Sequence, residues 1–114
     1  MSPITTHVLD TSRGRPAAGV AVTLELLEPE ASWRQLGWGE TDADGRLRDL
    51  LPEEHAPAPG VYRLTFETGA YFAARGVESF YPVAVVVFEV RAAGEHYHVP
   101  LLLNPFGYST YRGS

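Results

Sequence analysis

Short alternating runs, broken by glycine and proline, constrain this chain more than any other feature. Its 114 residues include 11 Gly and 9 Pro. Between them, apolar and polar residues alternate with the period of two that half-buried strands show. We expect strands at residues 5–9, 20–27, 34–40, 61–67, 83–90, 97–103 and 108–111. Residues 83–88 are continuously apolar, which predicts a strand buried on both faces. This pattern is typical of an all-β sandwich.

Turn residues separate these runs, and one segment predicts a helix. Residues 42–45 predict a tight turn with Gly45 at positive φ, and residues 12–16 and 104–107 predict two more. Residues 69–76 contain alanines and aromatics bounded by glycines. They predict a helix of about two turns, with Tyr71 or Phe72 packed on a sheet and Gly76 just beyond the helix end.

Size, charge and composition exclude several classes of protein. The length fits one domain, residues 1–114. The net charge of −5 argues against nucleic-acid binding, which needs a basic patch. The longest apolar run falls far short of the ~20 residues of a membrane helix. Cysteine is absent, so disulfides and thiolate nucleophiles are excluded. No secretory signal is visible, and we expect a cytoplasmic protein.

The C-terminal segment, residues 108–114, is unusual for a chain end. It reads Tyr-Ser-Thr-Tyr-Arg-Gly-Ser and keeps an alternating, aromatic character to Ser114. Chain ends fray unless other groups hold them in place. We therefore expect this segment to be ordered and to form part of a site.

Two of the four histidines, His7 and His98, lie in predicted strands, and His96 directly precedes the second of these strands. His96 and His98 are two residues apart, so both rings point to the same side of a strand. Three interpretations remain open for this pair: a zinc site completed by His7, acid–base chemistry without a metal, or a structural role. His7 alone fits either a structural or a catalytic role. His55 lies in a polar loop and is expected to be solvated.

Arg46 follows the predicted turn at residues 42–45. It is either a solvated turn residue or a ligand-binding one, since its planar guanidinium can bind two heteroatoms of a ligand at once. Two common catalytic motifs are missing from the sequence: the Gly-x-Ser-x-Gly turn of serine hydrolases and a glycine-rich phosphate loop.

Five ordered motifs resemble those of the 5-hydroxyisourate hydrolases, the transthyretin-related enzymes of urate breakdown. The motifs are residues 5–10 (TTHVLD), 41–46 (TDADGR), 80–82 (FYP), 96–103 (HYHVPLLL) and 108–114 (YSTYRGS). The resemblance implies a transthyretin-like β-sandwich of two four-stranded sheets with one short helix. It also implies a homotetramer, built as a dimer of dimers, with active sites between the dimers.

The same resemblance implies an activity and a set of site residues. The reaction is hydrolysis of a small molecule, 5-hydroxyisourate, to 2-oxo-4-hydroxy-4-carboxy-5-ureidoimidazoline, without metal or cofactor. His7 and His98 are expected to activate water and transfer protons, and Arg46 to bind substrate and the developing oxyanion. The tail is expected to form the wall of the substrate pocket, through Tyr111, Arg112, Gly113 and Ser114.

Three alternatives to this enzyme remain. A transthyretin-type carrier would share the fold but would not need His7, Arg46 and His98. A zinc hydrolase would use His96 beside His98, and an all-β interaction module would bind no small ligand. If the enzyme interpretation is right, we expect changes at His55 and His96 to matter less than changes at His98.

Overall fold

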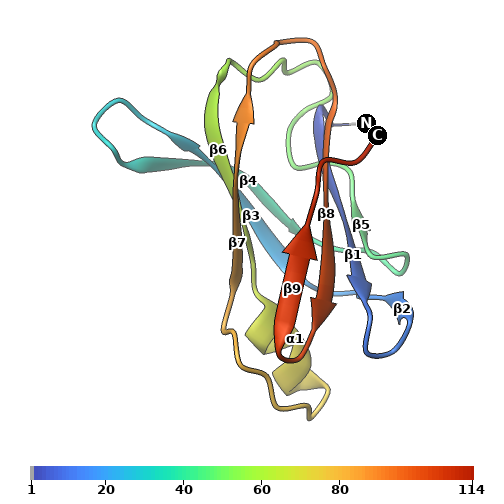
Figure 1. Cartoon of the computed structure of the whole chain (residues 1–114). Coiled ribbons are helices and arrows are strands. Elements are labelled where there is room, and N and C mark those ends of the chain that lie inside the picture. Colours follow the sequence, from blue (N-terminus) through green and yellow to red (C-terminus); the bar gives the residue numbers. More distant parts are fainter. Residues whose placement is uncertain (1) are drawn as a thin grey trace.

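Two facing sheets form the fold, and a short helix lies near one end of them (Figure 1). The structure, a computed structural model, describes residues 2–114. In chain order, the elements within that range are β1 (Ile4–Asp10), β2 (Arg15–Pro16), β3 (Ala21–Leu27), β4 (Trp33–Glu40), β5 (Arg46–Leu47), β6 (Gly60–Phe66), α1 (Thr68–Ala74), β7 (Ala84–Val90), β8 (Tyr97–Asn104) and β9 (Gly107–Thr110).

The strands join one sheet of five strands and one of four. The first has the order β2-β1-β8-β9, with β5 also paired to β1, and the second has the order β4-β3-β6-β7. The expected sandwich with one short helix is confirmed. The first sheet has five strands rather than four because the two-residue strands β2 and β5 pair with different parts of β1.

One strand pair brings the two ends of the chain together. β1 and β8 run parallel, with Thr5 opposite His98 and His7 opposite Pro100, whereas the other strand pairs are antiparallel. The motif at residues 5–10 therefore lies beside the motif at residues 96–103.

The core between the sheets is built from alternate residues of the long strands, as the alternation predicts. The expectation that β7 is buried on both faces is wrong. Ala84 and Val90 face the core and are 0% and 1% exposed, whereas Val85 and Val87 are 41% and 57% exposed. β7 is an edge strand of the four-stranded sheet, and residues 2–114 leave its outer face uncovered.

The predicted helix and turns are present. α1 begins at Thr68, and Gly76 follows its end with φ 72°, donating its N–H to the Ala73 carbonyl at 3.0 Å. Both Tyr71 and Phe72 are buried. The turns expected at 12–16, 42–45 and 104–107 are also present. Within residues 2–114, no helix is long and apolar enough to cross a membrane.

A buried carboxylate ties α1 to the five-stranded sheet. Asp10, at the end of β1, is 1% exposed. It accepts hydrogen bonds from the Tyr71 hydroxyl at 2.8 Å and from the Ser12 hydroxyl at 2.6 Å. Burial, and then the bond to Asp10, raise the pKa of Tyr71, so its hydroxyl stays protonated and donates.

We therefore expect Tyr71→Phe to lower the free energy of unfolding by about 1–3 kcal/mol, because it removes a donor from a buried carboxylate. Urea unfolding followed by circular dichroism measures this change. Tyr81→Phe is the matched control, since Tyr81 is 39% exposed, and it should unfold like the parent. Equal stability of the two variants would show that the Asp10 contact does not stabilise the fold.

Candidate active site

The face of the five-stranded sheet that points away from the core carries the predicted histidines. In β1, Thr6 and Val8 are 1% and 0% exposed on the inner side, so alternation turns Thr5 and His7 outward. The register of β1 and β8 sets Thr5 opposite His98. His7 and His98, 91 positions apart in the sequence, thus share one face through backbone pairing alone.

The turn before β5 places Arg46 on that same face. The Asp42 carboxylate accepts the N–H of Arg46 at 2.9 Å, and this bond is the largest cause that lowers the pKa of Asp42. Gly45, at φ 76°, passes so close to β1 that a Cβ there would lie 2.4 Å from the Val8 carbonyl oxygen. As a result β5 pairs with β1, with Arg46 opposite His7.

The C-terminal segment contacts His98. Gly113 forms an isolated β-bridge with His98 and donates its N–H to the His98 carbonyl at 2.8 Å. A Cβ on Gly113 would lie 2.6 Å from Cδ2 of the His98 ring. Glycine is therefore required here by contact with the ring, because the backbone at Gly113 has no positive φ.

A polar cavity of about 220 Å³, partly open to solvent, lies beside these contacts. Its lining residues come from β1, β5, the segment around the start of β8, and the tail: Thr5, Thr6, Arg46, Arg48, His96, His98 and Ser114. Two arginines and two histidines therefore face this space, and no Asp or Glu among residues 2–114 lines it. His7 lies beside this cavity but is not part of its lining.

Thr5 links two of the histidines, a contact that we did not anticipate from the sequence. Its Oγ1 lies 2.8 Å from Nδ1 of His98 and 3.0 Å from Nε2 of His96. Thr5 is 3% exposed, and the two imidazole rings stack with centroids 6.3 Å apart. The sequence gives one indication of this contact: Thr5 is two residues before His7, so both side chains lie on the same side of a strand.

His98 is held mainly in its neutral form. Burial is the largest cause that lowers its pKa from 6.5, followed by the charges of His96, Arg46 and His7. Each of these effects disfavours the imidazolium. A neutral imidazole next to guanidinium groups can accept a proton near neutral pH.

Two other tail residues, Tyr111 and Arg112, are not among the residues that line the polar cavity. Arg112 donates to the Glu95 carboxylate at 3.0 Å and to the His96 carbonyl at 3.5 Å, and its guanidinium lies 4.6 Å from the centre of the Tyr97 ring. Tyr111 is 58% exposed. With Arg112, it lines a second, more apolar cavity of about 300 Å³ between β7 and the tail.

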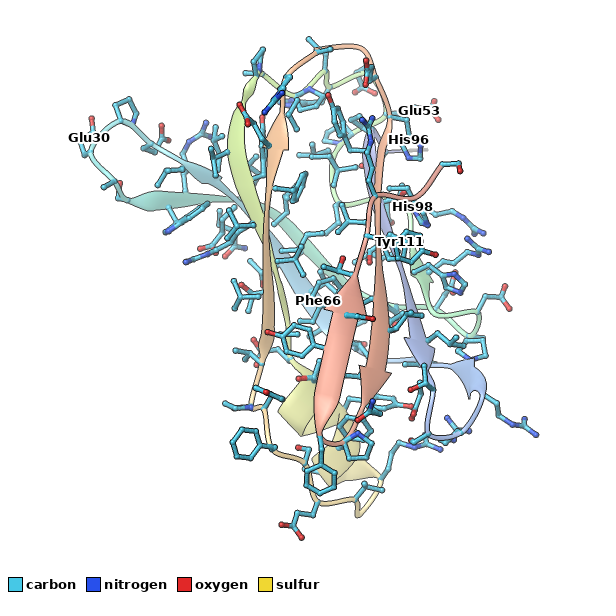
Figure 2. The ribbon with its side chains drawn as sticks, viewed as in Figure 1. Glu30, Glu53, Phe66, His96, His98 and Tyr111 are labelled. Carbon is cyan, nitrogen blue, oxygen red and sulfur yellow. The ribbon has the colours of Figure 1, made fainter. Side chains whose placement is uncertain are left out.

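Figure 2 shows His96, His98 and Tyr111 on the same side of the molecule, close to the C-terminal segment. Of the predicted site residues, Arg46, His98 and Ser114 line the polar cavity, with His7 and Gly113 next to it. Tyr111 and Arg112 do not line that cavity within one chain. His55 lies exposed in its loop. Residues 2–114 contain no group of three His, Cys, Asp or Glu side chains arranged to hold a metal ion.

The fold and this cavity together define a transthyretin-like β-sandwich with a histidine–arginine site on the outer face of one sheet. The chain belongs to the HIUase/Transthyretin family, which matches residues 4–113.

Similar proteins include members of both branches of that family. A 5-hydroxyisourate hydrolase of Salmonella dublin is 50% identical over 111 residues, covering 97% of this chain and 80% of the relative. The structure of Klebsiella pneumoniae 5-hydroxyisourate hydrolase has a TM-score of 0.84 and 41% identity, covering 97% and 98% of the two chains. Sea bream transthyretin in complex with thyroxine has a TM-score of 0.90 and 38% identity, covering 97% and 94%.

We expect His98 to titrate below pH 6.5 and Arg46→Gln to raise its pKa, because a neighbouring positive charge is lost. NMR titration of the imidazole signals measures both values. Arg63→Gln is the control, since Arg63 pairs with Glu25 on the other sheet, and it should leave the His98 pKa unchanged. An unchanged value in Arg46→Gln would show that the guanidinium does not act on this ring.

Proposed function

We propose that this chain hydrolyses 5-hydroxyisourate to 2-oxo-4-hydroxy-4-carboxy-5-ureidoimidazoline, a step of urate breakdown. One observation carries the proposal: Arg46, His98 and the tail residue Ser114 line one polar cavity. The identity of 50% to a protein named 5-hydroxyisourate hydrolase supports the same reaction. Similarity of fold does not separate this enzyme from a carrier, because the thyroxine-bound transthyretin has the same sandwich.

The reaction needs a base, and the histidines can supply it. Water adds to a carbonyl carbon of the six-membered ring, the carbon–nitrogen bond breaks, and the leaving nitrogen takes a proton. His98 suits the first proton transfer because its lowered pKa keeps it unprotonated. We propose that His7, which pairs with Arg46 in the sheet, assists the proton transfers.

Arg46 suits the stabilisation of negative charge that forms as water attacks. Its side chain lines the same cavity as His98, and its planar guanidinium can hold the carbonyl oxygen together with a second heteroatom of the substrate. The loss of one such donor commonly costs a factor of roughly 100–1,000 in rate. We propose that Gly113 and Ser114 form the cavity wall and that Tyr111 and Arg112 complete it from the adjacent side.

We propose that the working form is a homotetramer, a dimer of dimers. β7 and β9 are edge strands, and unpaired edges tend to pair with other chains. Val87 and Tyr111, near these edges, are 57% and 58% exposed. A closed symmetric assembly covers such surfaces without forming fibres. The cytoplasmic location expected from the sequence stays a prediction.

To test the activity, 5-hydroxyisourate can be generated from urate with urate oxidase and its ultraviolet absorbance followed. We expect this protein to speed the decay, and His7→Ala, Arg46→Ala or His98→Ala each to lower the rate by roughly 100-fold or more while the protein stays folded. His55→Ala, in an exposed loop, is the control and should keep the parent rate. Spontaneous decay in the presence of folded parent protein would refute the hydrolase and favour the carrier.

The tail gives a second prediction for the same assay. Gly113→Ala should lower activity strongly, because its Cβ would come within 2.6 Å of the His98 ring. Gly107→Ala is the matched control, since its Cβ would meet nothing closer than Asn104 at 3.8 Å. Deletion of residues 112–114 should also abolish most activity and leave the core intact. Full activity in Gly113→Ala would mean that the contact between the tail and His98 is not needed.

A further inference from the structure

We infer that Thr5 and His96 are positioning residues, which hold His98 in the tautomer with its proton on Nδ1 and leave Nε2 free as the base. The inference rests on the proposed function for its catalytic meaning. The tautomer of His98 itself can be measured without any substrate.

The hydroxyl of Thr5 contacts two ring nitrogens at once. Oγ1 lies within hydrogen-bond distance of Nδ1 of His98 and of Nε2 of His96, at 2.8 and 3.0 Å. A hydroxyl has one proton, so it donates to one ring and accepts from the other. Two arrangements are therefore possible. In one, His98 donates a hydrogen bond from Nδ1 to Thr5, the Thr5 hydroxyl donates one to Nε2 of His96, and Nε2 of His98 carries no proton. In the other, Nε2 of His98 carries a proton.

The charges around His98 favour the first arrangement. The groups that face the ring are His7 from β1, Arg46 from β5, and His96 from the segment before β8, and each disfavours added positive charge on it. Arg48 lines the same cavity. Within residues 2–114, Nε2 of His98 has no hydrogen-bond partner. The positive charges of Arg46 and Arg48 favour a lone pair on Nε2 over an N–H there.

The exposure of the two partners favours the same arrangement. Thr5 is 3% exposed, so water competes little for its hydroxyl, and backbone pairing with β8 fixes its position opposite His98. His96 is exposed. It can therefore accept at Nε2 while its own Nδ1–H is solvated by water.

The tail contacts the segment that carries His96, the third residue in this series of hydrogen bonds. Arg112 donates to the backbone carbonyl of His96 and to the carboxylate of the adjacent Glu95. These contacts fix the segment that presents the His96 ring to Thr5. This gives Arg112 a function although its side chain does not line the polar cavity within one chain.

The proton balance of the catalytic step is simple in this arrangement. Nε2 of His98 takes a proton from the attacking water, and the resulting imidazolium still donates from Nδ1 to Thr5. Thr5 still donates to His96, so the positive charge is stabilised along the hydrogen bonds. The proton on Nε2 then passes to the leaving nitrogen, and the starting tautomer is restored.

The test compares Thr5→Val, which removes the hydroxyl and nearly keeps the shape, with Thr5→Ser, which retains the hydroxyl. Nitrogen-15 NMR of the neutral ring reports which nitrogen of His98 carries the proton. We expect Nδ1–H in the parent and in Thr5→Ser, and a mixture with Nε2–H in Thr5→Val. We also expect kcat of Thr5→Val to fall about 10–100-fold, the range typical for loss of a group that orients a metal-bound histidine, with KM little changed.

His96→Leu is a second variant that should fold, because His96 is exposed. It removes the group that accepts a hydrogen bond from Thr5. We expect it to shift His98 towards the Nε2–H tautomer, as in Thr5→Val, with a smaller loss of kcat than in His98→Ala. His96→Gln, which keeps an acceptor oxygen, should restore part of the Nδ1–H population.

Two results would overturn the inference: Nε2–H as the main form in the parent, or a tautomer and kcat in Thr5→Val and His96→Leu equal to those of the parent. If the parent shows the Nδ1–H form, shifted by Thr5→Val, but no hydrolase activity, the proposed function fails while the positioning of His98 stands.

Discussion

The parallel pairing of β1 with β8 is the interaction on which the site depends. It sets Thr5 opposite His98, 93 positions away in the sequence. Pairing of β5 along the same strand then adds Arg46 opposite His7, and the Gly113 bridge adds the tail. Each of these contacts is between backbone groups, so the sheet itself holds the chemically active side chains together. A site built on strands in this way is held more precisely than one built on loops.

The core and the site use opposite faces of the same strands, which explains how one sandwich can serve two functions. The inner face of β1 and β8 is mostly apolar and buried, and its buried Thr6 and Asp10 are hydrogen-bonded. The outer face carries His7, His98 and Arg46, and these side chains can change without disturbing the core. The high structural similarity to a thyroxine-bound transthyretin therefore agrees with a different chemistry here, since function depends on the site rather than on the fold.

Local sequence patterns predicted most strands and the helix. The features that they did not predict depend on contacts between residues far apart in the sequence. Alternation predicted six of the seven longer strands, an apolar run predicted β7, and Gly76 marked the end of α1. The apolar run at 83–88 could not show that β7 is an edge strand, because burial depends on neighbouring strands. The two-residue strand β5 has no periodicity to detect. The motifs indicated His7, Arg46 and His98, but the bridging role of Thr5 and the turning of Arg112 towards Glu95 and Tyr97 arise only when β1, β8 and the tail meet.

The central claim is that the cavity formed by these contacts is where the substrate ring binds and reacts. A crystal structure of the protein with urate, a stable ring close in shape to the substrate, tests this most directly. We expect urate in the polar cavity, with the Arg46 guanidinium and Nε2 of His98 within hydrogen-bond distance of its heteroatoms and Ser114 beside it. Urate bound only in the apolar cavity beside Val87 and Tyr111, with Arg46 and His98 free of contact, would contradict the claim.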